Sequence, residues 1–294
     1  MFWLVFASLL WAFSFGLIKR FLPGLDPWWV AAVRLLLATL AFAPWLVRLR
    51  LAAADRVAAL LLGGLQFGLM YVCYLASYRY LSAWQVALWT VFTPILVVLV
   101  AQIRQRRVLA SAWVAAVLAV VGAILAQGQL PTGETLRGVL LVQASNLAFA
   151  VGQLGFGPLA RRAGIAGPRT AGREAGLVGW MSMGGAILAA GGALVAGRPL
   201  DLAGLGAASP VLLYLGLVPT ALGFWAWNRG AARVEAGRLG VANNLKIPLA
   251  VIVSWVVFGE AAAYGRAVGG LVIIVLALVW LTGRPRRSEG PGSS

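Results

Sequence analysis

Lys246 has the clearest chemical potential in the sequence, because it lies inside a long apolar stretch. A helix is predicted over residues 238–258, which places Lys246 about eight residues, or about 12 Å, from its start. A lysine at that depth costs about 2.5–3.5 kcal/mol on insertion into a bilayer, and no acidic residue falls mid-stretch to neutralise it. Lys246 is therefore a candidate to bind a carboxylate, although its long stem could instead carry the ammonium toward the membrane surface.

A second set of polar residues falls on one predicted helix, over residues 136–158. Gln143, Asn146 and Gln153 follow each other at i, i+3 and i+10, which places them on one helical face. Polar groups inside a membrane are costly unless they face protein or water, so this face is expected to line an interior cavity. The alternative for Asn146 is a hydrogen bond between helices, worth about 0.6 kcal/mol.

Aromatic side chains recur at helical spacing in other apolar stretches. Tyr71, Tyr74 and Tyr78 share a face at i, i+3 and i+7, and Trp11 lies on a similar stripe near the N-terminus. Trp89 is predicted to point into the same interior. Aromatic residues also gather at membrane interfaces, and this reading stays open for Tyr78, which lies near the end of its stretch.

The elements that must position these residues are apolar helices of membrane-spanning length. Of the 294 residues, 62% are hydrophobic and 11% are charged, and the mean hydropathy is +0.91. A soluble domain has about 45–50% apolar and about 25% charged residues. A span needs about 20 apolar residues, and ten such stretches are predicted, at residues 2–18, 27–47, 57–77, 83–103, 109–127, 136–158, 174–196, 208–228, 238–258 and 264–282.

The charged residues fix the orientation and exclude several protein classes. There are 24 Lys and Arg against 8 Asp and Glu, with no His. The basic residues cluster in the loops on the side of the N-terminus, which predicts that both termini are cytoplasmic and argues against nucleic-acid binding. Without His, with a single cysteine (Cys73) and without paired carboxylates inside a span, neither an enzyme active site nor a metal or cofactor site is expected.

The two halves of the chain resemble one another. Pro94 and Pro248 occupy corresponding places in the fourth and ninth predicted spans, and Asn243 lies where the first half has Trp89. Five spans per half is an odd number, so the second half is predicted to be inverted in the membrane, an arrangement typical of transporters with a midplane site. Each proline removes a backbone hydrogen bond and kinks its helix, so Pro94 and Pro248 are candidate hinges.

The predicted fold is therefore an all-α polytopic membrane protein with ten transmembrane helices in two inverted five-helix repeats. The first repeat covers residues 1–130 and the second covers residues 131–283. Residues 284–294 are expected to form a disordered cytoplasmic tail. Ten helices can enclose a cavity without a partner chain, so a monomer is sufficient.

Several short motifs resemble the EamA family of the drug/metabolite transporter superfamily. They are Trp11-Ala12-Phe13, Arg34-Leu-Leu-Leu-Ala, the two mid-span prolines and Phe258-Gly259-Glu260. The tyrosine-rich third span is most similar to the YddG-type aromatic amino acid exporters. The sixth span departs from the family, with Leu147-Ala148-Phe149 where members usually show Trp-Ala. The resemblance implies a transporter of the bacterial inner membrane.

The function expected from the sequence is export of amino acids, aromatic or bulky and apolar, by alternating access. The candidate substrate-binding residues are Trp11, Tyr74, Tyr78, Trp89, Asn146, Gln153, Asn243 and Lys246. Because no Asp, Glu or His lies mid-span, facilitated diffusion or uniport is expected, with proton coupling through Lys246 left open. The alternative substrates are organic anions, phosphorylated metabolites and drug-like solutes. For Arg34, near the outer end of its span, extension of the side chain to the surface is favoured.

Overall fold

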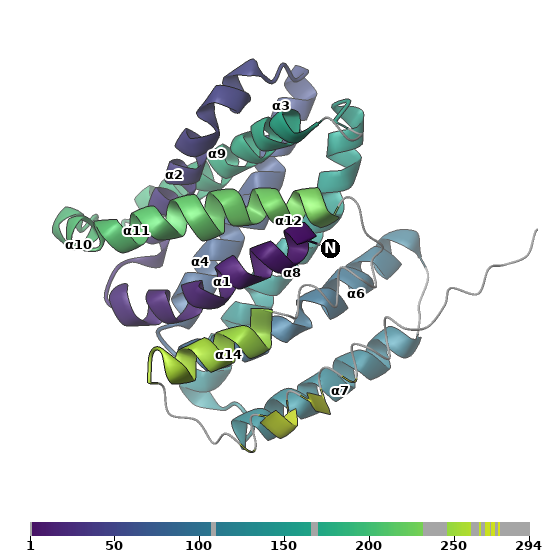
Figure 1. The fold of residues 1–294 in the computed structure, drawn as a ribbon, viewed down its shortest axis with the longest axis vertical. Coiled ribbons are helices and arrows are strands. Elements are labelled where there is room, and N and C mark those ends of the chain that lie inside the picture. The colour runs from purple at the N-terminus through teal and green to yellow at the C-terminus, as the bar shows by residue number, and fades with distance from the viewer. Residues whose placement is uncertain are drawn as a thin grey trace, which may run out of the picture.

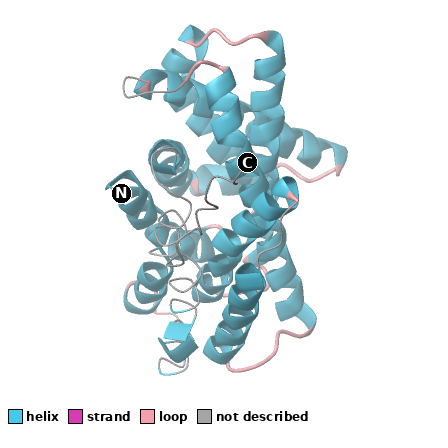
Figure 2. Cartoon of the chain, turned by 90° about the vertical axis from the view of Figure 1, so that its right-hand side faces the viewer, coloured by secondary structure: helices cyan, strands magenta, loops and turns pink. Residues whose placement is uncertain are grey.

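The computed structural model describes residues 2–106, 110–165, 170–231 and 246–259, with residues 265, 268–270, 272–273 and 276. All regular elements in this described part are helices (Figure 2). Seven helical stretches are long and apolar enough to cross a membrane, which confirms an all-α multi-pass membrane protein. They are Phe2–Phe21, Pro27–Arg48, Ala53–Ser77, Ala83–Gln105, Gly133–Arg162, Ala171–Val195 and Ser209–Ala231.

The helix boundaries follow the predicted spans to within a few residues. The continuous helices are α1 (Phe2–Phe21), α2 (Pro27–Arg48), α7 (Ala110–Gln127), α8 (Gly133–Arg162) and α9 (Ala171–Val195). Of the predicted ninth span, α14 (Lys246–Val256) is described, whereas the tail over residues 284–294 lies outside the described residues. The count of ten, the inverted repeats and the cytoplasmic termini therefore stay predictions.

Three spans are not regular α-helices along their whole length. The third consists of α3 (Ala53–Gly63), the π-helical segment η1 (Gly64–Leu69) and α4 (Met70–Ser77). The eighth is built in the same way, from α11 (Ser209–Leu215), the π-helical segment η3 (Gly216–Leu222) and α12 (Gly223–Ala231), after the short α10 (Leu202–Ala207). The fourth breaks at a 3₁₀ turn, η2 (Thr90–Phe92), between α5 (Ala83–Trp89) and α6 (Thr93–Gln105). Single-turn π segments occur frequently at functional sites.

Helices from the two halves of the chain pack against one another. The helix α2 lies along α9, and α4 lies along α8. Figure 1 shows α1 between α12 and α14, and both contacts are extensive. The interior is therefore lined jointly by elements that are far apart in the sequence.

Carboxylates lie at helix ends, as the sequence predicts. Asp55 and Glu174 fall in the first turns of α3 and α9. Glu174 pairs with Arg229 near the end of α12 at 2.7 Å, and Asp55 pairs with Arg162. Both ion pairs thus join the ends of neighbouring spans and leave the middle of the bundle to other polar groups.

Candidate functional site

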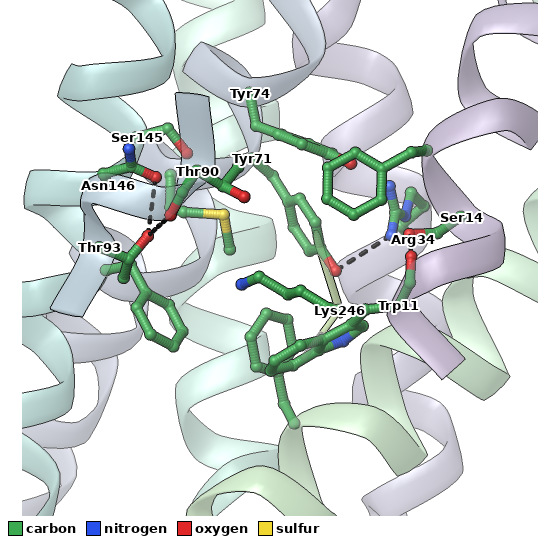
Figure 3. A pocket seen from close by; sticks show the side chains of 14 residues that line it. Trp11, Ser14, Arg34, Tyr71, Tyr74, Thr90, Thr93, Ser145, Asn146 and Lys246 are labelled. Atoms are coloured by element: carbon green, nitrogen blue, oxygen red, sulfur yellow. Dashed lines mark hydrogen bonds between the residues drawn. The ribbon is translucent and has the colours of Figure 1, made fainter. Parts of the chain in front are cut away.

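A cavity between the two halves is lined by several buried polar side chains from both of them (Figure 3). The cavity volume is about 80 Å³. In this conformation the cavity is smaller than typical ligand sites of about 300–1,000 Å³, but like them it combines an apolar wall with a few polar groups. The lining residues are Trp11, Ser14, Phe15, Arg34, Met70, Tyr71, Tyr74, Thr90, Thr93, Ser145, Asn146, Phe149, Phe224 and Lys246.

Lys246 extends into this cavity from the first turn of α14. Its side chain is 8% exposed, and its Nζ lies 5.1 Å from the centroid of the Trp11 ring. Figure 3 shows the ammonium directed toward the middle of the lining side chains, away from the helix that carries it. A cation over a tryptophan face is stabilised by the ring quadrupole. The structure therefore places Lys246 in the interior, and not on a path to the membrane surface.

The break in the fourth span creates the polar end of the cavity. Pro94 has no N–H, so the carbonyl of Thr90 accepts from the Thr93 N–H of the 3₁₀ turn in place of its usual α-helical partner. The Thr93 hydroxyl lies 2.8 Å from that carbonyl and supplies a donor. The carbonyl of Trp89, at the start of this turn, also accepts from Asn146 Nδ2 at 3.0 Å and from Gln143 Nε2 at 3.2 Å. In a membrane, freed carbonyls persist only where neighbouring groups re-satisfy them.

This polar end has acceptor capacity left over. The Thr93 hydroxyl lies 3.0 Å from Asn146 Oδ1 as well as 2.8 Å from the Thr90 carbonyl. A hydroxyl carries one proton, so it can donate fully to only one of these two oxygens at a time. The other oxygen is then open to an N–H or O–H donor from a solute.

Replacing Thr93 by valine should destabilise the folded protein by about 1–2 kcal/mol, because the hydroxyl hydrogen bond that the two buried acceptors share is lost. Thermal unfolding in detergent measures the effect. The matched control is Thr39→Val in α2, where the hydroxyl bonds the Leu35 carbonyl at 2.8 Å within a regular helix. Equal melting temperatures for the two variants would show that the broken span does not depend on Thr93.

Arg34 lines the cavity, which corrects the expectation that its side chain reaches the membrane surface. The residue is 1% exposed. Its Nη2 donates to Tyr71 Oη at 3.0 Å and to Thr220 Oγ1 at 3.1 Å. Its guanidinium carbon lies 4.2 Å from the centroid of the Tyr71 ring. The position of Arg34 near a span end did not reveal its burial, because its acceptor Thr220 comes from the eighth span, 186 residues further along the chain.

The eighth span, like the fourth, contains a proline next to a threonine whose hydroxyl bonds a backbone carbonyl. Pro219 lies within the π segment η3 and has no backbone N–H to donate. Thr220 Oγ1 donates to the carbonyl of Leu215 at 2.6 Å, and the Pro219 carbonyl accepts from Trp11 Nε1 at 2.8 Å. In both spans a proline lies next to a threonine inside an apolar stretch: Thr93-Pro94 and Pro219-Thr220. This pattern could have indicated Thr220 from the sequence.

Four predicted site residues line the cavity and four do not belong to the described lining. Trp11, Tyr74, Asn146 and Lys246 line it. Three of the others make different contacts: Tyr78 bonds Tyr74 and lines a second cavity near residues 18–30, Trp89 Nε1 bonds Gln127, and Gln153 accepts from Trp227. Asn243 lies outside the described residues.

The candidate hinges differ in what the structure describes around them. Pro94 is the second residue of α6, directly after the 3₁₀ turn, so the helix breaks ahead of it. Pro248 is the third residue of α14, and the residues immediately before α14 lie outside the described part. A hinge role for either proline stays a prediction.

Two segments of the chain, residues 1–127 and 175–283, match the EamA-like transporter family. Together they cover most of the sequence and account for its two similar halves. The chain belongs to the EamA-like transporter family. It is therefore a membrane transporter and not an enzyme. In this EamA-like transporter, the cavity residues Ser145, Asn146 and Phe149 of α8 fall between the two matched segments.

Curated relatives of this EamA-like transporter share its full length. A protein of Pseudomonas aeruginosa PAO1 named "Probable biotin transporter" is 38% identical over 288 residues, which is 97% of this chain and 98% of that one. A "Biotin transporter" of Escherichia coli K12 is 30% identical over 292 residues, or 97% and 95% of the two chains. A "Biotin transporter" of Salmonella typhimurium is 30% identical over 281 residues, covering 95% and 91%.

The fold of the EamA-like transporter also has a counterpart among solved structures. One crystal structure superposes with a TM-score of 0.67 over 96% of both chains, at 20% sequence identity. At this identity the likeness concerns the fold alone.

Proposed function

We propose that this EamA-like transporter carries biotin across the cytoplasmic membrane of a bacterium. The full-length relatives named biotin transporters support this substrate over the amino acids expected from the YddG-type resemblance. Biotin offers three chemically different parts to a binding site: a carboxylate on a flexible chain, a sulfur-containing bicycle and a ureido group with two N–H donors and one carbonyl.

The observation that carries the proposal is the charge of the cavity. Its described lining residues include two cations, Arg34 and Lys246, and no carboxylate. A monocarboxylate such as biotin brings one negative charge to this cavity. An amino acid would bring an ammonium as well, and that group would meet two cations without an acidic partner. Like charges in a poorly solvated cavity repel strongly.

The uncharged polar end suits the ureido group. Asn146 and Thr93 present an acceptor that their own hydrogen bonds leave open, and Thr90 and Ser145 line the same end. A ureido N–H could donate to this open acceptor, while the aromatic walls from Trp11 and the neighbouring spans pack against the bicycle. Carboxylate toward Lys246 and ureido toward Asn146 would orient the substrate across the cavity.

The mode of transport is proposed to be alternating access between the two halves, as uniport. No Asp, Glu or His belongs to the described lining, so a carboxylate proton relay has no residue on these surfaces. Ten spans in two inverted five-helix repeats, with both termini on the cytoplasmic side, remain part of this proposal.

Uptake of radiolabelled biotin into proteoliposomes tests the function. Wild-type protein should accumulate label in counterflow against unlabelled internal biotin, and empty liposomes provide the background. Biotin should compete with the label, whereas phenylalanine and a sugar phosphate should not. Absence of biotin counterflow from folded protein would contradict the proposal and favour an organic anion or an amino acid as substrate. Equal competition by phenylalanine would contradict it and favour an amino acid.

A further inference from the structure

Arg34 is the least satisfied cation in the described interior. Its Nη2 donates to Tyr71 and Thr220, but Nε and Nη1 are buried without a hydrogen-bond partner among the described residues. No described salt bridge involves Arg34. Buried charges are normally paired or fully hydrogen-bonded, and an exception calls for an explanation.

Packing against Tyr71 does not supply that explanation by itself. The ring lies 4.2 Å from the guanidinium carbon and stabilises the charge through its face. It offers no acceptor in the plane of the guanidinium, where the N–H groups of Nε and Nη1 point. A partner for these N–H groups would be an anion or a strong acceptor, which the described residues do not supply.

The position of Arg34 allows that partner to be a solute. Arg34, Tyr71 and Lys246 all line the central cavity. In Figure 3 the Tyr71 side chain is seen between Arg34 and the Lys246 ammonium, with its hydroxyl bonded to the guanidinium. A rotation of Tyr71 would expose the guanidinium to the space that Lys246 already faces.

The partners of Arg34 also connect it to both irregular spans. Tyr71 is the second residue of α4, directly after the π segment η1, and Thr220 lies within the π segment η3. Tyr71 Oη and Thr220 Oγ1 lie 2.9 Å apart and close a three-membered network with Nη2. An anion that binds Arg34 must displace hydrogen bonds of this network, so its binding would change the contact between the third and eighth spans.

We propose that Arg34 is a second carboxylate-binding residue of the cavity, which takes the substrate carboxylate when the Tyr71–Thr220 bridge opens. This inference rests on the proposed function, because it needs a carboxylate solute. Lys246 then receives the anion on entry and Arg34 completes its binding. Guanidinium groups suit this role because they donate several hydrogen bonds to a carboxylate in a fixed geometry.

The test compares biotin with biotinamide, which keeps the ring system and lacks the negative charge. Dissociation constants are measured in detergent for wild type, Arg34→Gln, Arg34→Lys and Thr220→Val. Arg34→Gln should weaken biotin by about tenfold or more and leave biotinamide within about twofold of wild type. Arg34→Lys should keep the preference for biotin at a lower affinity. Thr220→Val, which retains the charge and removes a competitor for Nη2, should bind biotin at least as tightly as wild type.

The other outcomes distinguish failure of the Arg34 inference alone from failure of the proposed function. If wild type binds biotin and Arg34→Gln weakens biotin and biotinamide equally, Arg34 holds the helices together; if it weakens neither, Arg34 does not contact the substrate. Either result overturns the inference alone. Where Arg34→Gln does not fold, loss of the preference for biotin in Arg34→Lys, or weaker biotin binding in Thr220→Val, overturns it. If folded wild type binds neither compound, the proposed function and the inference fail together.

Discussion

Replacing Lys246 by methionine should reduce biotin transport by about thirtyfold or more while raising the melting temperature of the protein. The loss of transport follows because the ammonium that faces the cavity is removed, and truncating one partner of a buried charge pair costs about 2–5 kcal/mol. The gain in stability follows because methionine has a similar length and removes the insertion cost of a buried lysine, about 2.5–3.5 kcal/mol. Initial rates of proteoliposome uptake and thermal unfolding measure the two effects.

The opposite signs separate a binding role from a structural one. A lysine that mainly holds helices together would lose transport and stability at once. Lys246→Arg keeps the charge and should retain measurable transport with a raised KM. The matched control is Lys19→Met: Lys19 Nζ donates to the carbonyls of Tyr78 and Leu81 and lies outside the central cavity. That variant should lose stability and keep the KM for biotin; wild-type transport by Lys246→Met would remove Lys246 from the site.

Span positions were predictable because lipid imposes one simple requirement on each stretch. About 20 apolar residues are needed to cross the bilayer, and composition alone reveals such stretches. The π segments within the third and eighth spans were not predictable in this way. Whether a backbone N–H bonds the fourth or the fifth preceding carbonyl leaves no trace in hydropathy, and it depends on packing against neighbouring helices.

Part of the cavity was predictable and part was not. Asn146 and Lys246 stood out because a polar group in lipid is costly wherever it lies. Gln153 shares a face with Asn146, but it lies seven residues further along the helix, beyond the cavity, and its side chain accepts from Trp227. Arg34 was misplaced because its burial depends on Thr220, a contact across 186 positions of sequence that no local pattern contains.

Arg34 bears on the substrate class. The aromatic residues, Lys246 and the YddG-type resemblance together led to the expectation of amino acids, with organic anions as the alternative. Once Arg34 joins Lys246 in the cavity, the lining carries two cations and no carboxylate among the described residues. Charge balance then argues for an anion without an ammonium group, independently of the aromatic walls.

Replacing Gly184 by alanine should destabilise the protein by about 3 kcal/mol or more. Gly184 of α9 lies against α3, and a Cβ added there would overlap the backbone carbonyl of Leu60. In return, a Cβ at Gly63 of α3 would overlap the carbonyl of Met181 in α9. Both obstacles are backbone atoms, so no side-chain rotation can relieve them and the two helices must separate. Small residues at such crossings allow the close approach that holds membrane helices together.

Gly191 provides the matched control within the same helix. An added Cβ at Gly191 meets nothing within 4 Å. Because alanine favours a helix over glycine by about 1 kcal/mol, Gly191→Ala should leave the melting temperature unchanged or raise it slightly, whereas Gly184→Ala should lower it by several degrees. Similar melting temperatures for both variants would mean that α3 and α9 do not cross at these glycines. The position of Arg34 would then also be in question, because α9 packs against α2, the helix that carries Arg34.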